Sequence, residues 1–161
     1  MATPPTPTLS PAAAGAPTPR IVLPTDTMLK AMLAASKQVS ALIFSPGRPP
    51  QVELNGELAP VKVEGVPRLT AEDTARIAGD LIGSNKVAVE KLRQEGSCDI
   101  SYSLQGMSRF RVNIFTQRGT CAIVMRVIPT VIPDFSSYNL PSQLAAICDL
   151  KNGIVLTTVA M

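Results

Sequence analysis

The feature that most restricts the fold of this chain is the hairpin pattern of Ser108–Pro129. Apolar and polar residues alternate along Arg109–Thr116, and a β-branched, apolar run follows at Cys121–Ile128. Between them we expect a tight turn at Arg118 and Gly119, because glycine adopts a positive φ without steric cost. With these two residues as the loop, every cross-strand pair of the hairpin is determined.

This register predicts one almost wholly apolar face, which must be the buried one. Its facing pairs are Phe110 with Val127, Val112 with Met125, Ile114 with Ile123, and Thr116 with Cys121.

The opposite face is predicted to place Arg111 directly across from Arg126, with Arg109 two residues along. Like charges in direct opposition are destabilising. Two interpretations follow. In one, the face is a solvated basic surface whose arginine side chains extend apart into water. In the other, the guanidinium groups form a clamp for a phosphate or carboxylate. A one-residue slip of the turn would remove the opposition.

Composition excludes several classes of function. The 161 residues suit one domain, and the absence of histidine removes histidine-based catalytic and metal chemistry. We therefore expect no catalytic residue and no metal site. Cys98, Cys121 and Cys148 are spaced too far apart for a metal motif and predict reduced core or boundary thiols in a cytosolic protein. The mild net charge of +3, without a Lys/Arg block, predicts no nucleic-acid partner.

The domain boundaries follow from proline and from periodicity. Residues 1–24 are rich in proline and predict a disordered or polyproline-like tail, and nothing there resembles a signal peptide. Residues 25–129 predict one α+β domain. Its other expected elements are a helix capped by Asp26, a strand at Ala41–Phe44, a hairpin turning at Asn55-Gly56, a helix capped by Thr70 with Asp73, a helix at Asn85–Glu95 ending at Gly96, and a strand at Cys98–Leu104.

The region after Pro129 predicts a separate unit. Residues 130–149 read as a linker with a short helix at Ser142–Asp149, because the prolines stop the preceding strand. A buried-type strand is expected at Ile154–Thr158. It has no partner strands of its own, so residues 150–161 predict the start of a further domain.

Five sequence blocks, in the same order as in a known family, carry a resemblance. They are S-P-G-R-P-P-Q-V-E-L-N-G-E-L, L-T-A-E-D-T, G-S-C-D-I-S-Y-S-L, R-F-R-V-N-I-F-T-Q-R-G-T-C-A-I-V-M-R-V-I-P and L-K-N-G-I-V-L-T-T. From about Thr25 to Thr158 the chain resembles the N-terminal module of the type IV pilus retraction ATPases, the twitching-motility (PilT) family of the type II/IV secretion ATPase superfamily.

The resemblance implies a PAS-like antiparallel sheet flanked by helices, followed by a linker and the first strand of a RecA-like ATPase domain. The family machine is a cytoplasmic homo-hexamer, peripheral to the inner membrane, that uses ATP and Mg. Its N-terminal module contacts the RecA-like domain of the same or a neighbouring subunit, and the motor works with the pilus inner-membrane platform.

The phosphate-binding loop of the family is absent. Val159-Ala160-Met161 stand where G-P-T-G-S-G-K-S/T should begin, and no G-x-x-x-x-G-K-[ST] occurs in the chain. The acidic and histidine boxes are absent too. We therefore expect this chain, truncated before that loop, to bind no cofactor and to hydrolyse no ATP by itself.

The resemblance also assigns a role to the arginines, because family members reach nucleotide phosphates with arginines of this module. Arg111 and Arg126 match the two family positions, and Arg109 and Arg118 match more weakly. One departure is Ala41–Phe44, where the family has an Asp-Leu-His-like stretch. Alternatives are a free-standing PAS-like sensor module, or part of a type II secretion or pilus extension ATPase. The R-G turn and the V-M-R-V-I-P ending favour retraction.

Overall fold

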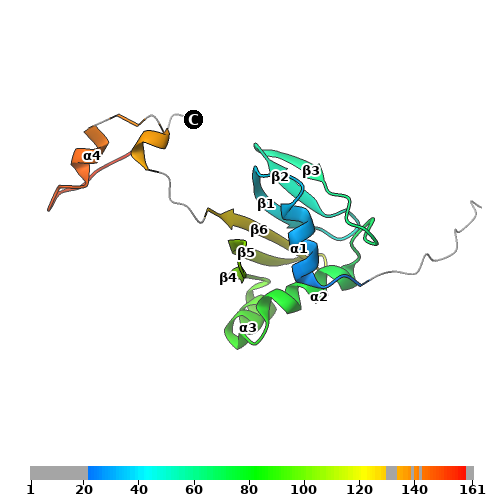
Figure 1. Ribbon diagram of the computed structural model, residues 1–161. Coiled ribbons are helices and arrows are strands. Elements are labelled where there is room, and N and C mark those ends of the chain that lie inside the picture. Colours follow the sequence, from blue (N-terminus) through cyan, green and yellow to red (C-terminus); the bar gives the residue numbers. More distant parts are fainter. Residues whose placement is uncertain (1–21, 130–133, 139, 142, 159–161) are drawn as a thin grey trace, which may run out of the picture.

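The computed structural model describes residues 22–129, 134–138, 140–141 and 143–158 (Figure 1). One six-stranded antiparallel sheet, with strand order β3-β2-β1-β6-β5-β4, forms its centre. The strands are β1 (Val39–Phe44), β2 (Gln51–Leu54), β3 (Glu57–Pro60), β4 (Ser97–Leu104), β5 (Ser108–Gln117) and β6 (Thr120–Ile128). The expected α+β class is confirmed.

Three helices cover one face of the sheet: α1 (Thr25–Leu33), α2 (Ala71–Ile82) and α3 (Lys86–Glu95) (Figure 1). Their apolar side chains join the inward-facing side chains of the strands in one core. The C-terminal part carries a 3-10 turn, η1 (Phe135–Tyr138), and a short helix, α4 (Gln143–Ile147). In the described part of the chain, no helix is long and apolar enough to cross a membrane.

The central hairpin of β5 and β6 has the predicted register throughout. Arg118 and Gly119 form its turn, both with positive φ, 51° and 79°. Such a turn matches the right-handed twist of the two strands. The sequence analysis expected a positive φ at the glycine alone. The apolar face is the buried one, and its fully buried members are Phe110, Val112, Ile114, Ile123 and Met125.

Local capping chemistry sets the ends of two helices, as predicted. The Thr70 side chain accepts a hydrogen bond from the backbone N–H of Asp73, whose carboxylate accepts one from the backbone of Thr70. Asn85, which the sequence analysis placed inside the helix, is the N-cap residue of α3, and its side-chain oxygen accepts a hydrogen bond from the backbone N–H of Ala88. Gly96 ends α3 in the left-handed conformation with φ at 75°, which a residue with a Cβ adopts only under strain.

Asp26 does not cap α1, so that prediction was wrong. A cap at Asp26 would start the helix at Thr27. It starts two residues earlier, at Thr25, and its N-cap residue is Pro24, which has no side-chain hydrogen bond to offer. Asp26 lies instead in the first turn, where a carboxylate still interacts favourably with the helix dipole. Its carboxylate accepts a hydrogen bond from Tyr102, a residue distant in the sequence. Local sequence patterns do not reveal such a contact.

The predicted strand Ile154–Thr158 is not formed. Its residues are irregular and exposed, Ile154 to 87% and Leu156 to 86%. A strand needs a hydrogen-bonded neighbour, and none pairs with these residues in the described part of the chain. Most of the predicted proline-rich tail, 1–24, and Val159–Met161 lie outside the described residues. The proposed boundaries of the tail, linker and further domain therefore remain predictions.

The cysteines differ from one another in exposure. Cys98 is buried in the core, Cys121 is half-buried, and all three thiols are free. Burial raises the pKa of the Cys98 thiol, which is therefore a poor nucleophile. Cys148 is exposed, so the expectation of a core or boundary position fails for it.

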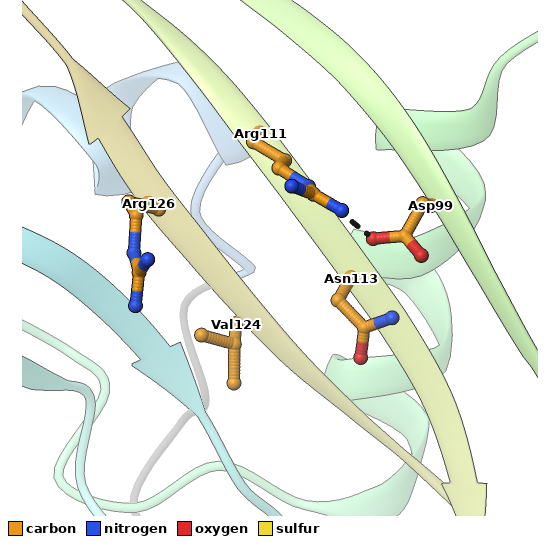
Figure 2. Close-up of a pocket in the computed structure, with 5 residues that line it drawn as sticks. All are labelled: Asp99, Arg111, Asn113, Val124 and Arg126. Atoms are coloured by element: carbon orange, nitrogen blue, oxygen red, sulfur yellow. Dashed lines mark ion pairs between the residues drawn. The ribbon is translucent and has the colours of Figure 1, made fainter. Parts of the chain in front are cut away.

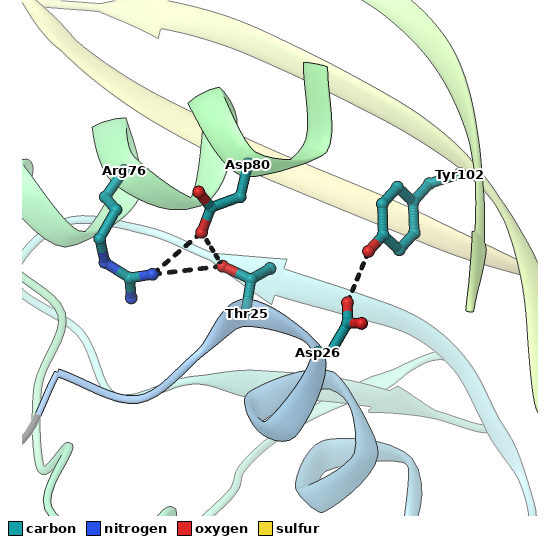
Figure 3. Close-up of polar contacts among 5 residues, drawn as sticks. All are labelled: Thr25, Asp26, Arg76, Asp80 and Tyr102. Atoms are coloured by element: carbon teal, nitrogen blue, oxygen red, sulfur yellow. Dashed lines mark hydrogen bonds and ion pairs between the residues drawn. The ribbon is translucent and has the colours of Figure 1, made fainter. Parts of the chain in front are cut away.

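A polar cluster joins the start of α1 to α2 and β4 (Figure 3). Thr25 Oγ1 donates a hydrogen bond to Asp80, and Arg76 Nη1 donates to both, at 3.3 Å to Thr25 and 3.0 Å to Asp80. On the other side of the helix start, the Tyr102 hydroxyl donates to the Asp26 carboxylate. The first turn of α1 is therefore held from two neighbouring elements.

The Tyr102–Asp26 hydrogen bond should make the domain sensitive to alkaline pH. The carboxylate of Asp26 raises the pKa of Tyr102 to about 12, with burial contributing less. The hydrogen bond is present below the ordinary tyrosine pKa of about 10 and is lost as pH rises through about 12. Tyr102→Phe should cost about 1 kcal/mol at pH 7. It should also flatten the fall in stability between those two pH values, measured by urea unfolding. An unchanged alkaline fall would contradict this role.

Candidate anion-binding site

The face of the sheet that no described helix covers, called the uncovered face below, carries a shallow depression across β4, β5 and β6 (Figure 2). Its volume is about 250 Å³. Alternation along the strands brings every second side chain to this face, away from the core. The lining residues are Asp99 of β4, Arg111 and Asn113 of β5, and Val124 and Arg126 of β6.

Arg111 and Arg126 lie directly opposite each other in the β5–β6 ladder, as the sequence predicted. Their side chains do not converge. Arg111 extends toward β4, where its Nε lies 3.8 Å from Asp99 Oδ1, and Arg126 points along a separate direction (Figure 2). Arg126 makes no ion pair with any described residue. The two guanidinium groups therefore point apart, and only the charge of Arg111 is partly neutralised by a carboxylate.

Asp99 compensates Arg111 only weakly. The two side chains are exposed to 55% and 73%, and an ion pair of this kind in water contributes about 0–1 kcal/mol. An incoming phosphate or carboxylate with two oxygens makes shorter, bidentate contacts with a guanidinium group. We conclude that the depression presents two arginines that an anion can engage.

The polar residues Asp99 and Asn113 line the site but were not among its predicted residues. They face each other in the β4–β5 ladder. That ladder begins at the pair Leu104 and Ser108, so its loop is Gln105–Met107. The turn signal at Gln105-Gly106 left the length of this loop undetermined, and that length decides the β4 neighbours of Arg111: Ser101 lies directly opposite it and Asp99 lies diagonally. With the length known, alternation alone would have found Asp99.

The four predicted arginines are not gathered at one point. Arg109 lies on the same face as Arg111, two residues or about 7 Å along the strand, opposite Ile128. Arg118 lies in the β5–β6 turn and lines a different depression, together with Arg48. Only Arg111 and Arg126 share the central depression.

The residues of this depression suit the recognition of an anion. Its residues include no nucleophile activated by a base. Among the described residues, no group of three or more Cys, Asp or Glu side chains could hold a metal ion. Two guanidinium groups and one amide instead supply hydrogen-bond donors for oxyanions.

Solved structures contain the same fold. The crystal structure of the pilus retraction motor PilT with bound ADP is 30% identical, with a TM-score of 0.64, over 81% of this chain and 35% of that chain. The ATPase DotB of Legionella pneumophila is 24% identical, with a TM-score of 0.55, over 80% of this chain and 35% of that chain. The ATPase DotB of Yersinia pseudotuberculosis is 24% identical, with a TM-score of 0.54, over 74% of this chain and 33% of that chain.

The DotB likenesses show the fold alone, because their identity is low. The chain spans about a third of the length of the three structures that it matches. No protein-family model matches the sequence, and no curated protein matches it.

Proposed function

Because this chain belongs with the N-terminal regions of the PilT-like type II/IV secretion ATPases, we propose that it serves as the N-terminal module of a pilus retraction motor. The retraction branch is supported by the 30% identity to a structure described as a pilus retraction motor. In this proposal the module supplies contacts at the subunit interface and arginines that reach nucleotide phosphates held by an ATPase domain.

The observation that carries the proposal is the Arg111–Arg126 opposition on the uncovered sheet face. Two like charges in direct opposition destabilise the strand pair, and a neutral residue at either position would remove this cost. An anionic ligand offsets that cost, and a nucleotide phosphate of a neighbouring ATPase domain provides one. Arg109, on the same face, and Arg118, in the turn, take part more weakly in this proposal.

The rest of the proposal concerns the complete machine. ATP and Mg are the ligands of the ATPase domain, and this chain holds neither by itself. The motor is a homo-hexamer in which this module packs against the RecA-like domain of its own or a neighbouring subunit. It works in the cytoplasm at the inner membrane, against the pilus platform.

A chimera tests this function. Residues 25–158 of this chain would replace the matching N-terminal region of PilT, upstream of the PilT ATPase domain. We expect ATP turnover within tenfold of PilT, whereas this chain alone and the ATPase domain alone should stay near background, because an arginine acting on phosphate is worth roughly 10³-fold or more. Turnover is measured by phosphate release. A folded chimera no faster than the ATPase domain alone would contradict the proposal.

A further inference from the structure

A second depression lies at the turn end of the β5–β6 hairpin, on the uncovered face of the sheet. Its volume is about 510 Å³. The turn between β1 and β2 contributes Arg48 and Ser45, the end of β5 contributes Gln117, and the β5–β6 turn contributes Arg118. Phe115 and Ala122 also line it, and they face each other in the β5–β6 ladder. This site is distinct from the central one, because Phe115 lies four residues, or about 13 Å, along β5 from Arg111.

The charge of this depression is uncompensated. No acidic residue is among those that line it. In the part of the chain that the structure describes, neither Arg48 nor Arg118 makes an ion pair or a side-chain hydrogen bond. By contrast, Arg76 and Arg93 on the helices each contact a carboxylate. Two free guanidinium groups thus flank a floor that includes an aromatic ring.

Arg118 occupies its position at a backbone cost. Its φ is 51°, in the left-handed region that asparagine and glycine adopt most easily. The other two-residue turn of the domain, Asn55-Gly56, uses the favoured asparagine at the equivalent place. Arginine at position 118 therefore gives the turn no conformational advantage. A strained residue of this kind points to a role for its side chain.

We propose that this depression is a docking site for an acidic segment of a partner protein. Arg48 and Arg118 bind carboxylates of the segment, while Phe115, Ala122 and Pro46 receive an apolar side chain that lies between them. Charge complementarity favours an acidic partner. The apolar floor and the size of the depression favour a peptide segment over a free inorganic anion, which makes no use of such a floor. This inference does not rest on the proposed motor function, which gives Arg118 a weaker contact with phosphate, and the test below separates the two ligands.

The test uses the 161-residue chain and a fluorescein-labelled peptide of alternating glutamate and leucine. Fluorescence anisotropy at low salt should show binding that weakens as salt screens the charges. Arg48→Gln and Arg118→Asn should each reduce affinity about fivefold. Arg118→Asn also checks folding, because asparagine suits the turn and should raise the melting temperature by a few degrees, about 2–4 °C. Arg93→Gln, on α3, is the matched control and should change nothing.

Several results would overturn the proposal. They are an absence of binding, equal binding of a peptide with glutamine in place of glutamate, and an equal loss with Arg93→Gln. Loss of binding with Arg126→Gln, but not with Arg48→Gln or Arg118→Asn, would assign the segment to the central depression instead. Inorganic phosphate is also added at a concentration equal to the Kd of the peptide. If it displaces the peptide at that concentration, the depression is a site for small anions and the peptide-docking proposal is refuted.

Discussion

Replacing Arg111 or Arg126 with glutamine should reduce the ATP turnover of the chimeric motor by roughly 10³-fold, the scale on which an arginine that acts on transferring phosphate contributes. Glutamine keeps much of the side-chain length and a hydrogen-bond donor but carries no charge. The loss should appear mainly in kcat, because the developing phosphate charge is stabilised most in the transition state. Phosphate release under saturating ATP measures it.

The same substitutions should affect the 161-residue chain very differently. Arg126 has no acidic partner among the described residues, and it faces a like charge. Arg126→Gln should therefore leave the free energy of unfolding unchanged or raise it by up to about 1 kcal/mol. For Arg111→Gln the loss of the exposed contact with Asp99 offsets part of this gain. Urea unfolding at low and high salt measures both, and the gain should shrink as salt increases.

The two measurements together separate a phosphate-binding role from a structural one. Arg93→Gln is the matched control, since Arg93 is exposed, pairs with Glu90 on α3, and lies away from the sheet face. It should leave turnover unchanged. Destabilisation of the chain by Arg126→Gln, combined with normal turnover of the motor, would refute the phosphate-binding role.

Phe110→Ala should destabilise the domain by about 3–5 kcal/mol, the range for removing a buried phenylalanine ring. Phe110 is fully buried and lies between Tyr102 of β4 and Val127 of β6, beneath the helices. Removal of the ring leaves a cavity. The surrounding strands cannot close it, because hydrogen bonds on both sides hold their register. A loss of this size is a large share of the 5–15 kcal/mol that stabilises a typical domain.

Phe115→Ala provides the control within the same strand. Phe115 is five residues from Phe110 and therefore points to the opposite, uncovered face, where it is only half-buried. Its removal should cost about 1 kcal/mol. Urea midpoints of the two variants compare the faces directly. Equal losses at the two positions would contradict the assignment of the buried face.

The sequence by itself determined the features that depend on neighbours in the chain. The Arg118-Gly119 turn set the β5–β6 register, and alternation then assigned both faces, including Arg111 opposite Arg126. Capping chemistry located the start of α2 at Thr70 and the end of α3 at Gly96. Each of these inferences rests on interactions between residues that are close in sequence or joined by a short turn, so the residue types and their spacing suffice.

The tertiary structure alone decided the contacts between distant segments. Asp26 bonds to Tyr102, 76 residues away, and not to its own helix. Arg48 meets Arg118 in one depression only because β1 pairs with β6 and so brings the two turns together. Ile154–Thr158 has the composition of a strand but forms none, because a strand requires a partner that no local pattern supplies. Periodicity specifies which side of an element is apolar, whereas strand order and loop length decide what that side meets.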